Sequence, residues 1–590
     1  VIPMKDVRSV PVKTSTLVTG KFREFFVPTL LASMASQMGV FVDSLLVGNM
    51  ISSNAMAGVG VCLPLEQILG SSALLFSVGA AAMIAAALGS GKNNEADRLY
   101  SYVITLDLVA ATLFLVLMLP FVREIATFLA GEQEIAEPAY EYLRVMVWRT
   151  PFLMLLASAD ILVRTDGKAT ISSQGIVISQ IVNIVLDLLL IGPFQLGITG
   201  AAIATVTSDV AGILYIAVRY LFARDRSLHF TAFDEGIKVF FKRVKEILAS
   251  GMAAAIAYSL VSVKIWCVYR ILGSSGGDDA MKVYTVCLDC LVLLSLVVAG
   301  CQGALLPILG VLYGEKDYRG ARMLTNYALK FTLGIDAICI LFICLFPKYV
   351  FGIFKITGDL AEKGSFGLRL FSLSVLGVAF SFMMMYYYST VEQAAAANLI
   401  SVVEGILVVP MSLLSVRFLA DDGVWISFVL SEILTVVVVL IYVRLKQRKN
   451  PDACPDIYLI PKTISELLYD VSVEATGENA ALLSKDAVEK LKGNGIADEI
   501  AIKAGIALEE MTLNLITASK RPVEMDVRII RSKDHISIAM RDNGTPFNPV
   551  EYNPEEKEKY ITDGILLFKA LAKDIKYNRV LNLNQTIIEL

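Results

Sequence analysis

Four oxygen-bearing side chains stand inside apolar segments of residues 1–222, where polar groups are costly. Asp43 lies in the apolar run 25–48, Asn183 and Asp187 lie in the run 170–192, and Thr205 lies in the run 199–221. A charge at the bilayer centre costs at least about 2.5–3.5 kcal/mol on insertion scales, so each acid needs a reason for its place. Two carboxylates, an amide oxygen and a hydroxyl form a set that suits a small hard cation.

The spacing of these residues predicts that they meet. Asn183 and Asp187 are four positions apart, which puts both side chains on one face of a helix. At about 1.5 Å of rise per residue, Asp43, Asp187 and Thr205 lie at similar depth in the outer half of the membrane. The carboxylates could instead hold a proton, because desolvation and a neighbouring like charge both favour the protonated form. A third interpretation is interhelical hydrogen bonding without any ion.

The second half of the sequence does not repeat this set. When the two halves are aligned so that Arg144 falls on Arg369, Val408 and Ser412 stand under Asn183 and Asp187. Other charges in apolar runs are predicted to be dispersed, either lining a cavity or joining helices; they are Lys264, Asp289, Asp336, Glu404 and Glu432. The ion site is therefore expected in the N-terminal bundle only.

The composition requires a membrane for most of the chain. Of the 590 residues 56% are apolar and 18% charged, and the mean hydropathy is +0.64, well above soluble domains. Runs long enough to span a bilayer number twelve, at 25–48, 58–88, 101–121, 142–163, 170–192, 199–221, 250–272, 283–312, 322–346, 366–388, 395–417 and 423–443. The net charge of −4 argues against a nucleic-acid binder. We expect a lipid bilayer and small-molecule substrates as partners, and no nucleic acid.

The distribution of positive charge predicts that both termini are cytoplasmic. Lysines and arginines gather in alternate loops, and the loop 122–141 is acidic and expected outside. Sliding the sequence along itself until Gly79 falls on Gly303 also places Arg98 on Arg322. Two halves of six spans share one orientation, as in transporters built from parallel repeats. We therefore expect a multi-pass protein of the cytoplasmic (inner) membrane.

Three domains are predicted. Residues 1–222 form an N-terminal six-helix bundle, 223–450 an amphipathic linker and a second six-helix bundle, and 451–590 a soluble cytoplasmic α/β domain. The segment 230–248 is charged and amphipathic, which favours a helix lying on the membrane face. In the last domain the patterns predict helices at 486–491, 499–516 and 565–574, and strands at 525–530, 535–540 and 585–590.

Three short motifs in residues 451–590 suggest a nucleotide pocket. Glu510 and Asn514 share one helix face, as a catalytic general base and a magnesium ligand would. Asp542 follows a strand and could accept a hydrogen bond from an amino group, beside Gly544, which lets a flat base approach. Gly564 opens a helix whose N-terminal amides could receive phosphate. ATP and magnesium are thus the cofactors expected here.

The membrane region resembles the multidrug and toxic compound extrusion (MATE) family over about residues 20–446. The resemblance rests on the twelve spans and on DSLLVGNMISSNAMAGVG, LGSGKNNEADR, RTDGKATISSQGIVISQIVNIVLDLLLIGPFQLGITGAAIAT and QGALLPILGVLYGEKDYRGAR. It implies a two-lobed antiporter that exports organic, often cationic, compounds with sodium or proton influx. In prokaryotic members an Asp of span one, an Asn and an Asp of span five and a Thr of span six bind the cation, and Asp43, Asn183, Asp187 and Thr205 match this pattern.

Two departures accompany the resemblances. Some relatives carry a carboxylate in span seven, where this chain has Lys264, which argues against a cation site in the second lobe. The tail, over about residues 460–590, resembles the histidine-kinase-like (GHKL) ATPases and most closely the anti-sigma-factor serine kinases. In that family the last glycine box carries two or more glycines, and here Thr562 stands at one of those places while Gly564 remains. A nucleotide-free interaction domain on the same scaffold is the alternative.

The sequence thus predicts a cation-coupled exporter with a fused regulatory nucleotide-binding domain, which could contact a cytoplasmic regulatory protein. One alternative is a lipid-linked or polysaccharide flippase of the same superfamily, and the acids of spans one and five favour the exporter over it. Another is a membrane-anchored serine kinase that uses the transporter part as a sensor. The presence of both Asp43 and Asp187 favours a membrane region that still transports over one that acts only as a sensor.

Overall fold

The computed structural model divides the chain into two compact units. The membrane unit comprises Arg23–Glu315 and Ala321–Ile460, and the tail unit comprises Val1–Phe22, Lys316–Gly320 and Pro461–Leu590. The structure describes all residues except 1–15, 131–132, 224, 232–235, 276, 355, 357, 462–465, 520, 533–534 and 552–563.

Helices long and apolar enough to cross a membrane make up the membrane unit. In the described part of the chain there are eleven, and the last of them, α14 (Ala394–Lys449), is two helices joined at Ala420, whose φ of 50° is not helical. With α14 counted as two helices, the twelve predicted spans are all present. The first half, here called the N-lobe, contains α1 (Thr16–Met50), α2 (Ser53–Gly89), α3 (Asn93–Met118), η1 (Leu119–Phe121), α4 (Val122–Ala130), α5 (Gln133–Met146), η2 (Val147–Arg149), α6 (Thr150–Thr165), α7 (Ala169–Ile191) and α8 (Gly197–Leu221). The second half, the C-lobe, contains α9 (Ile237–Ser275), α10 (Gly277–Gly314), α11 (Tyr318–Leu345), α12 (Pro347–Ile353), α13 (Asp359–Thr390) and α14.

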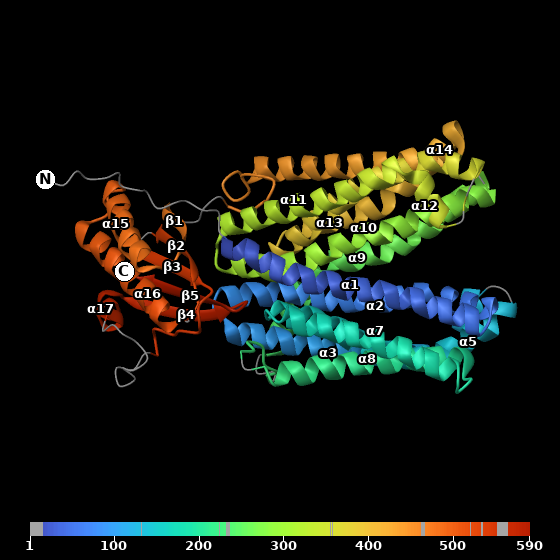
Figure 1. The fold of residues 1–590 in the computed structure, drawn as a ribbon, viewed down its shortest axis with the longest axis horizontal. Helices are drawn as coiled ribbons and strands as arrows, with labels where there is room; N and C mark the ends of the chain where they lie inside the picture. The colour runs from blue at the N-terminus through green and yellow to red at the C-terminus, as the bar shows by residue number, and fades with distance from the viewer. Residues whose placement is uncertain are drawn as a thin grey trace. The chain divides into compact units, whose positions relative to one another are not determined.

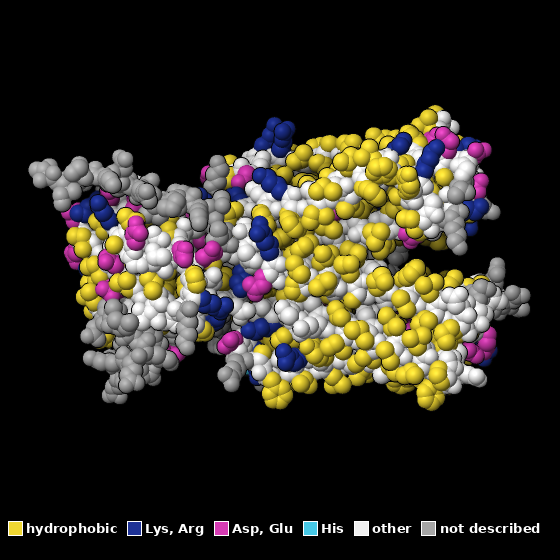
Figure 2. Space-filling view, in the orientation of Figure 1, with side chains coloured by type: hydrophobic (Ala, Val, Ile, Leu, Met, Phe, Trp, Pro, Cys, Tyr) yellow, Lys and Arg dark blue, Asp and Glu magenta, His cyan; other side chains and the backbone are white. Residues whose placement is uncertain are grey.

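Apolar side chains cover the outer faces of these helices, as lipid contact requires. Figure 2 shows many hydrophobic side chains along the helices of both lobes, with charged side chains mostly at the helix ends. The amphipathic segment 230–248 was expected to form a helix lying on the membrane face. Its residues from Ile237 onward are instead the start of α9, which continues without a break into the apolar span.

Glycines bring the two lobes into backbone contact along α2. A Cβ placed on Gly79 would lie 2.2 Å from the carbonyl oxygen of Ile247 on α9, and one on Gly251 would lie 1.9 Å from that of Leu75. A Cβ on Gly314 of α10 would lie 2.0 Å from the carbonyl oxygen of Ala86. Only glycine allows so close an approach. In Figure 1 the blue to teal N-lobe helices lie beside the green to orange C-lobe helices, with α1 and α2 next to the C-lobe.

The tail unit contains a five-stranded antiparallel sheet with helices packed on it. The strands are β1 (Glu466–Glu474), β2 (Glu524–Arg531), β3 (Ile536–Asp542), β4 (Asp574–Val580) and β5 (Leu583–Glu589), and the helices are α15 (Gly477–Gly493), α16 (Asp498–Ala518) and α17 (Gly564–Leu571). The strand order is β1-β2-β3-β5-β4. Leu483 and Leu508 from the helices and Ile529, Ile538 and Ile588 from the strands meet in one core. The predicted helices and three strands are present, whereas β1 and β4 were missed.

Candidate functional site

Three N-lobe helices bring the four predicted oxygen-bearing residues together. Asp43 comes from α1, Asn183 and Asp187 from α7, and Thr205 from α8. The side-chain amide of Asn183 donates to the Thr205 hydroxyl at 3.4 Å. The carboxyl groups of Asp43 and Asp187 are close enough to interact electrostatically. Asp187 is fully buried, yet neither of its oxygens has a hydrogen-bond partner among the described residues, and neither does Asp43 Oδ1. Buried carboxylate oxygens without partners are costly unless a cation or a proton joins them.

A charged network that the sequence analysis missed adjoins this set. Arg149 donates through Nε to Asp209 at 2.7 Å and through a terminal nitrogen to Glu66 at 3.0 Å, and Tyr142 donates to Glu66 at 3.3 Å. Glu66 and Arg149 are close enough to Asp43 to interact with it electrostatically. A signal was available, because Glu66 and Asp209 are charges within predicted spans. Their common partner could be found only from the helix packing.

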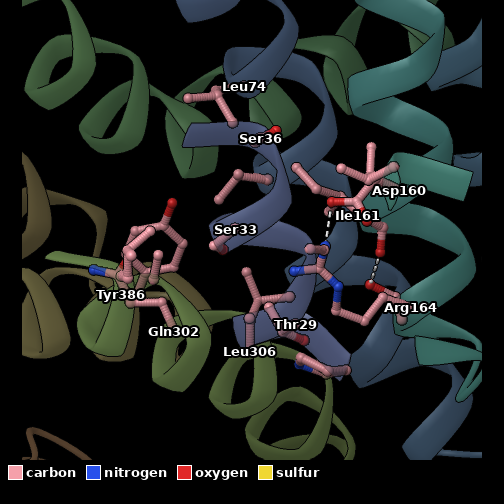
Figure 3. A pocket seen from close by; sticks show the side chains of 18 of the residues that line it. Thr29, Ser33, Ser36, Leu74, Asp160, Ile161, Arg164, Gln302, Leu306 and Tyr386 are labelled. Carbon is pink, nitrogen blue, oxygen red and sulfur yellow. Dashed lines mark hydrogen bonds and ion pairs between the residues drawn. The ribbon is translucent and has the colours of Figure 1, made fainter. Parts of the chain in front are cut away.

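A cavity of about 330 Å³ lies between the lobes, in the lower part of the size range of small-molecule sites. Its polar lining comprises Thr29, Ser33, Ser36, Gln37, Asp160, Arg164, Thr165, Ser295, Gln302 and Tyr386. Figure 3 shows Arg164 and Asp160 of the N-lobe on one side and Gln302 and Tyr386 of the C-lobe on the other. The residues that line it do not include the four of the candidate cation set.

Arg164 contributes a positive charge to the lining of this cavity. It pairs with Asp160 one turn earlier on α6, and Ser172 of α7 donates to the same carboxylate. The Arg164 Nε is buried and has no partner in the described part of the chain. The i, i+4 spacing of Asp160 and Arg164 in the sequence could have indicated this pair.

In the C-lobe the structure corrects the expectation that buried charges are dispersed. Lys264 of α9 pairs with Glu404 of α14, and Glu432, also on α14, interacts electrostatically with both. Asp336 is fully buried on α11, with no partner for either oxygen among the described residues. Asp289 is exposed on α10.

Residues 450–460, which we call the strap, are bound to the C-lobe helices by their backbone. Tyr388 donates to the carbonyl oxygen of Ile457 at 2.7 Å, Tyr387 to that of Tyr458 at 3.1 Å, and Gln393 to that of Leu459 at 3.2 Å. Arg322 of α11 binds the Asp456 carboxylate at 2.9 Å and the Ile460 carbonyl oxygen at 2.8 Å. Tyr387 and Tyr388 are themselves fully buried.

In the tail unit, Asp542 is held by two neutral donors. Its Oδ1 accepts from the Gly544 amide at 2.8 Å and from the Asn584 side chain at 2.7 Å. Burial raises the pKa of Asp542 to about 6, although both hydrogen bonds act to lower it. A Cβ on Gly544 would lie 2.7 Å from Ser519 Oγ, so glycine is needed beside the carboxylate. Asn584 was missed because it reaches Asp542 only through the pairing of β3 with β5.

The other predicted nucleotide residues are only partly arranged for that task. Asn514 is fully buried on α16 and donates to the backbone carbonyl of Glu510 at 2.7 Å. Glu510 Oε2 is buried without a partner among the described residues, and burial and then Glu509 raise the pKa of Glu510. Gly564 begins α17 as predicted. Thr562 lies outside the described residues.

The tail unit also encloses the loop Lys316–Gly320. Asp317 accepts from Arg528 at 3.2 Å and Arg541 at 3.4 Å on neighbouring strands, and from the Gly320 amide at 2.9 Å. Burial would raise the pKa of Asp317, but Arg528 and Arg541 outweigh it and hold this pKa below its ordinary value. The loop joins α10 to α11, so one connection between transmembrane helices belongs to the compact unit of the tail.

This architecture defines a two-lobed polytopic membrane transporter with a small α/β domain at its C-terminal end. The MatE family model matches residues 28–189 and 253–414, one match in each lobe. The chain therefore belongs to the MATE family of multidrug efflux transporters. The model of the histidine kinase-like ATPase domain matches residues 473–590, so the tail carries that domain.

Named relatives and solved structures agree with this assignment. The multidrug export protein MepA of Staphylococcus aureus (strain MSSA476) is 23% identical over 433 residues, covering 72% of this chain and 94% of MepA. MepA of Staphylococcus haemolyticus (strain JCSC1435) is 22% identical over 430 residues, with the same coverage. A crystal structure of MATE in complex with MaL6 has a TM-score of 0.68 at 21% identity, covering 73% of this chain and 97% of that one.

Proposed function

We propose that this protein is a secondary active antiporter of the cytoplasmic membrane, with both termini cytoplasmic, that exports organic, often cationic, compounds in exchange for sodium or protons. The observation that carries the proposal is the pair of adjoining carboxyl groups of Asp43 and Asp187, whose buried oxygens have no partners among the described residues. Such a pair can accept a cation or a proton and release it again. The relatives named as multidrug export proteins support the substrate class.

The coupling follows from differential binding. An ion moves a conformational equilibrium only if it binds one state more tightly than the other. Asp43 lies on α1 and Asp187 on α7, so a cation bound between them would link these two helices. The cavity lined by Arg164 and Tyr386 lies between the lobes. In this proposal the substrate binds in that cavity, apart from the cation at Asp43 and Asp187.

The proposal is tested with the purified full chain in proteoliposomes and ethidium as the fluorescent probe cation. Sodium and pH gradients are imposed separately. Export driven by either gradient supports the antiporter and identifies the coupling ion. Ethidium movement that ignores both gradients would contradict ion coupling, and movement that requires ATP would transfer the driving role to the tail.

We further propose that the tail binds adenine nucleotide and regulates transport rather than driving it. Asp542 with Gly544 supports the recognition of an adenine amino group, and Glu510 with Asn514 supports the base and magnesium-ligand roles. The strap supports regulation, because the segment leading into the tail is hydrogen-bonded to α11, α13 and the turn before α14. A cytoplasmic regulatory protein acting through the tail is part of this proposal.

Two truncations separate the tail from the strap. A chain ending at residue 460 keeps every strap contact and lacks the nucleotide domain, whereas a chain ending at residue 449 lacks both. We expect ion-driven export from both, with ATP or ADP altering export only in the full chain. A full chain whose export is identical with and without nucleotide would contradict regulation by nucleotide.

A further inference from the structure

The C-lobe buries three ionisable groups against one another at membrane depth. The Lys264 ammonium donates to Glu404 Oε1, and the exposed fractions of these side chains are 13% and 1%. Glu432 is 6% exposed and interacts electrostatically with both. Glu404 Oε2 and Glu432 Oε2 are buried and have no hydrogen-bond partner among the described residues. Two carboxyl groups therefore lie near one ammonium, which is hydrogen-bonded to Glu404 alone.

The charge balance of this cluster calls for one proton. With both acids ionised, the cluster would hold an uncompensated negative charge away from water, which is costly. Lys264 neutralises Glu404 through a direct hydrogen bond, so Glu432 is the acid left to be neutralised. A metal cation is disfavoured, because Lys264 already provides the positive charge and two carboxyl groups offer at most four oxygens, whereas hard cations take about six or more oxygen ligands.

The pairing also selects which acid carries the proton. Two like charges close together cannot both ionise easily, and a cation bound to one of them favours ionisation of that one. Among the described residues, the charged groups that face Glu432 are Lys264 from α9 and Glu404 from the first part of α14. Its third neighbour, α13, presents Gly377.

The contact with Gly377 connects this acid to the cavity between the lobes. A Cβ on Gly377 would lie 2.5 Å from Glu432 Cβ and 3.2 Å from its Oε2, so the carboxyl group rests directly on the α13 backbone. Tyr386, nine residues further along the same helix, lines the cavity. The distance along the helix is about 14 Å. Loss of the proton would put a charge against this backbone, and a shift of α13 would reach the cavity.

We propose that Glu432 is a proton-binding site of the C-lobe, which takes up and releases one proton in each export cycle while Lys264 stays hydrogen-bonded to Glu404. This inference rests on the proposed antiport and adds to it a second site with a different ligand. The O–H bond forms on the free Glu432 oxygen with a proton from water on one side of the membrane. It breaks when that proton returns to water on the other side.

Infrared difference spectroscopy of the full chain between acid and alkaline pH tests the site without requiring transport. We expect a titrating carboxylic-acid C=O band in the wild type that Glu432→Gln removes. Asp336→Asn is the matched control, since it neutralises another buried acid of the C-lobe and should leave this band in place. A band that persists in Glu432→Gln would overturn the proposal.

Lys264→Met provides a second variant in case Glu432→Gln does not fold. Without its ammonium, Glu404 should also take a proton, so a second carboxylic-acid band should appear; an unchanged spectrum would contradict the assignment. In proteoliposomes, the number of protons moved per ethidium exported should fall by one in Glu432→Gln. Spectra as expected with no coupled flux would mean that the proposed antiport fails while the proton site stands.

Discussion

The two lobes share a helical plan but neutralise their buried acids in different ways. In the N-lobe, Asp43 and Asp187 adjoin each other and their free oxygens lack partners among the described residues. In the C-lobe, Glu404 has a lysine of the same protein as its counter-ion. The alignment of the two halves that pairs Arg144 with Arg369 puts Lys264 on Gly39, one turn before Asp43, and Glu404 on Ser179, two turns before Asp187. The same helix pair therefore carries these acids in both lobes, but only in the C-lobe does one of them have a directly hydrogen-bonded lysine on that pair.

The strongest test of this difference removes the internal cations. Arg149→Met leaves two acids, Glu66 and Asp209, without their partner, so it should destabilise the protein at the upper end of the about 3–5 kcal/mol that breaking a buried pair costs. Lys264→Met should fall at the lower end, because it frees one paired acid. Thermal unfolding in detergent measures both.

Exposed pairs provide the controls for these variants. Arg123 pairs with Glu137 and Lys282 with Asp279 at exposed positions, and such pairs contribute about 0–1 kcal/mol. Arg123→Met and Lys282→Met should therefore leave the unfolding midpoint nearly unchanged. If the exposed and the buried variants lost equal stability, the buried ion pairs of Arg149 and Lys264 would contribute no more than exposed pairs.

Asp542 in the tail provides a third case, since it is a buried acid whose hydrogen-bond donors are both neutral. Its pKa of about 6 lies above the ordinary 3.8, so its stabilising contribution is complete below the unfolded value and is lost as the pH rises through about 6. Nucleotide binding should depend on pH in the opposite sense, because only the ionised carboxylate accepts from an adenine amino group. Affinity should fall by up to about tenfold per pH unit below 6.

Titration calorimetry of the full chain with ADP measures this dependence. Asp542→Asn should remove it, and Asn584→Ala should move its midpoint to higher pH, because it removes a hydrogen bond that lowers the pKa. Asp574→Asn, at a half-exposed position of β4, is the control. A midpoint that does not move in Asn584→Ala would contradict the role assigned to that contact.

A smaller effect is expected from relieving the carboxyl pair of the N-lobe. Asp187→Asn removes the repulsion between adjoining acids and should stabilise the protein by about 1 kcal/mol without added cation, as substitutions at functional sites often do. The coupling cation should stabilise the wild type and not the variant. Thermal unfolding with and without sodium, at two pH values, separates the relief of repulsion from the stabilisation by the bound cation. A variant less stable than the wild type would show that Asp187 has a structural partner.

The smallest effect concerns the strap, which binds C-lobe helices. Tyr388→Phe removes one hydrogen bond, which contributes about 0.5–1.5 kcal/mol. Cys454 in the strap is a buried free thiol, so its reaction rate with a maleimide reports loosening. We expect faster labelling in Tyr388→Phe and an unchanged rate in Tyr349→Phe, whose ring is exposed. Equal rates would contradict the role of Tyr388 in holding the strap.

The sequence alone predicted those features that depend on a single helix or on the depth of a residue within its span. Hydropathy predicted the spans, and the spacing of Asn183 and Asp187 with the depth of Asp43 predicted the N-lobe set. The Lys264 cluster could not be found this way, because it depends on how α9 packs against both parts of α14. In the tail, β1 and β4 are the sheet edges and carry charged residues among apolar ones, which weakens a strand pattern. The sequence also does not predict the contacts of Tyr387 and Tyr388, because their partners are backbone carbonyls far along the chain, in the strap.

The central claim is that the unpartnered acids of α1 and α7 couple the ion to export, and one flux measurement tests it most directly. Gradient-driven ethidium export is compared between wild type, Asp43→Asn, Asp187→Asn and Asp107→Asn in proteoliposomes. Asp107 is an equally buried acid on α3, with no partner for its oxygens among the described residues. We predict that export is abolished in the first two variants and retained in Asp107→Asn, with all three folded. Equal loss in all three, or export retained in Asp43→Asn and Asp187→Asn, would contradict this coupling.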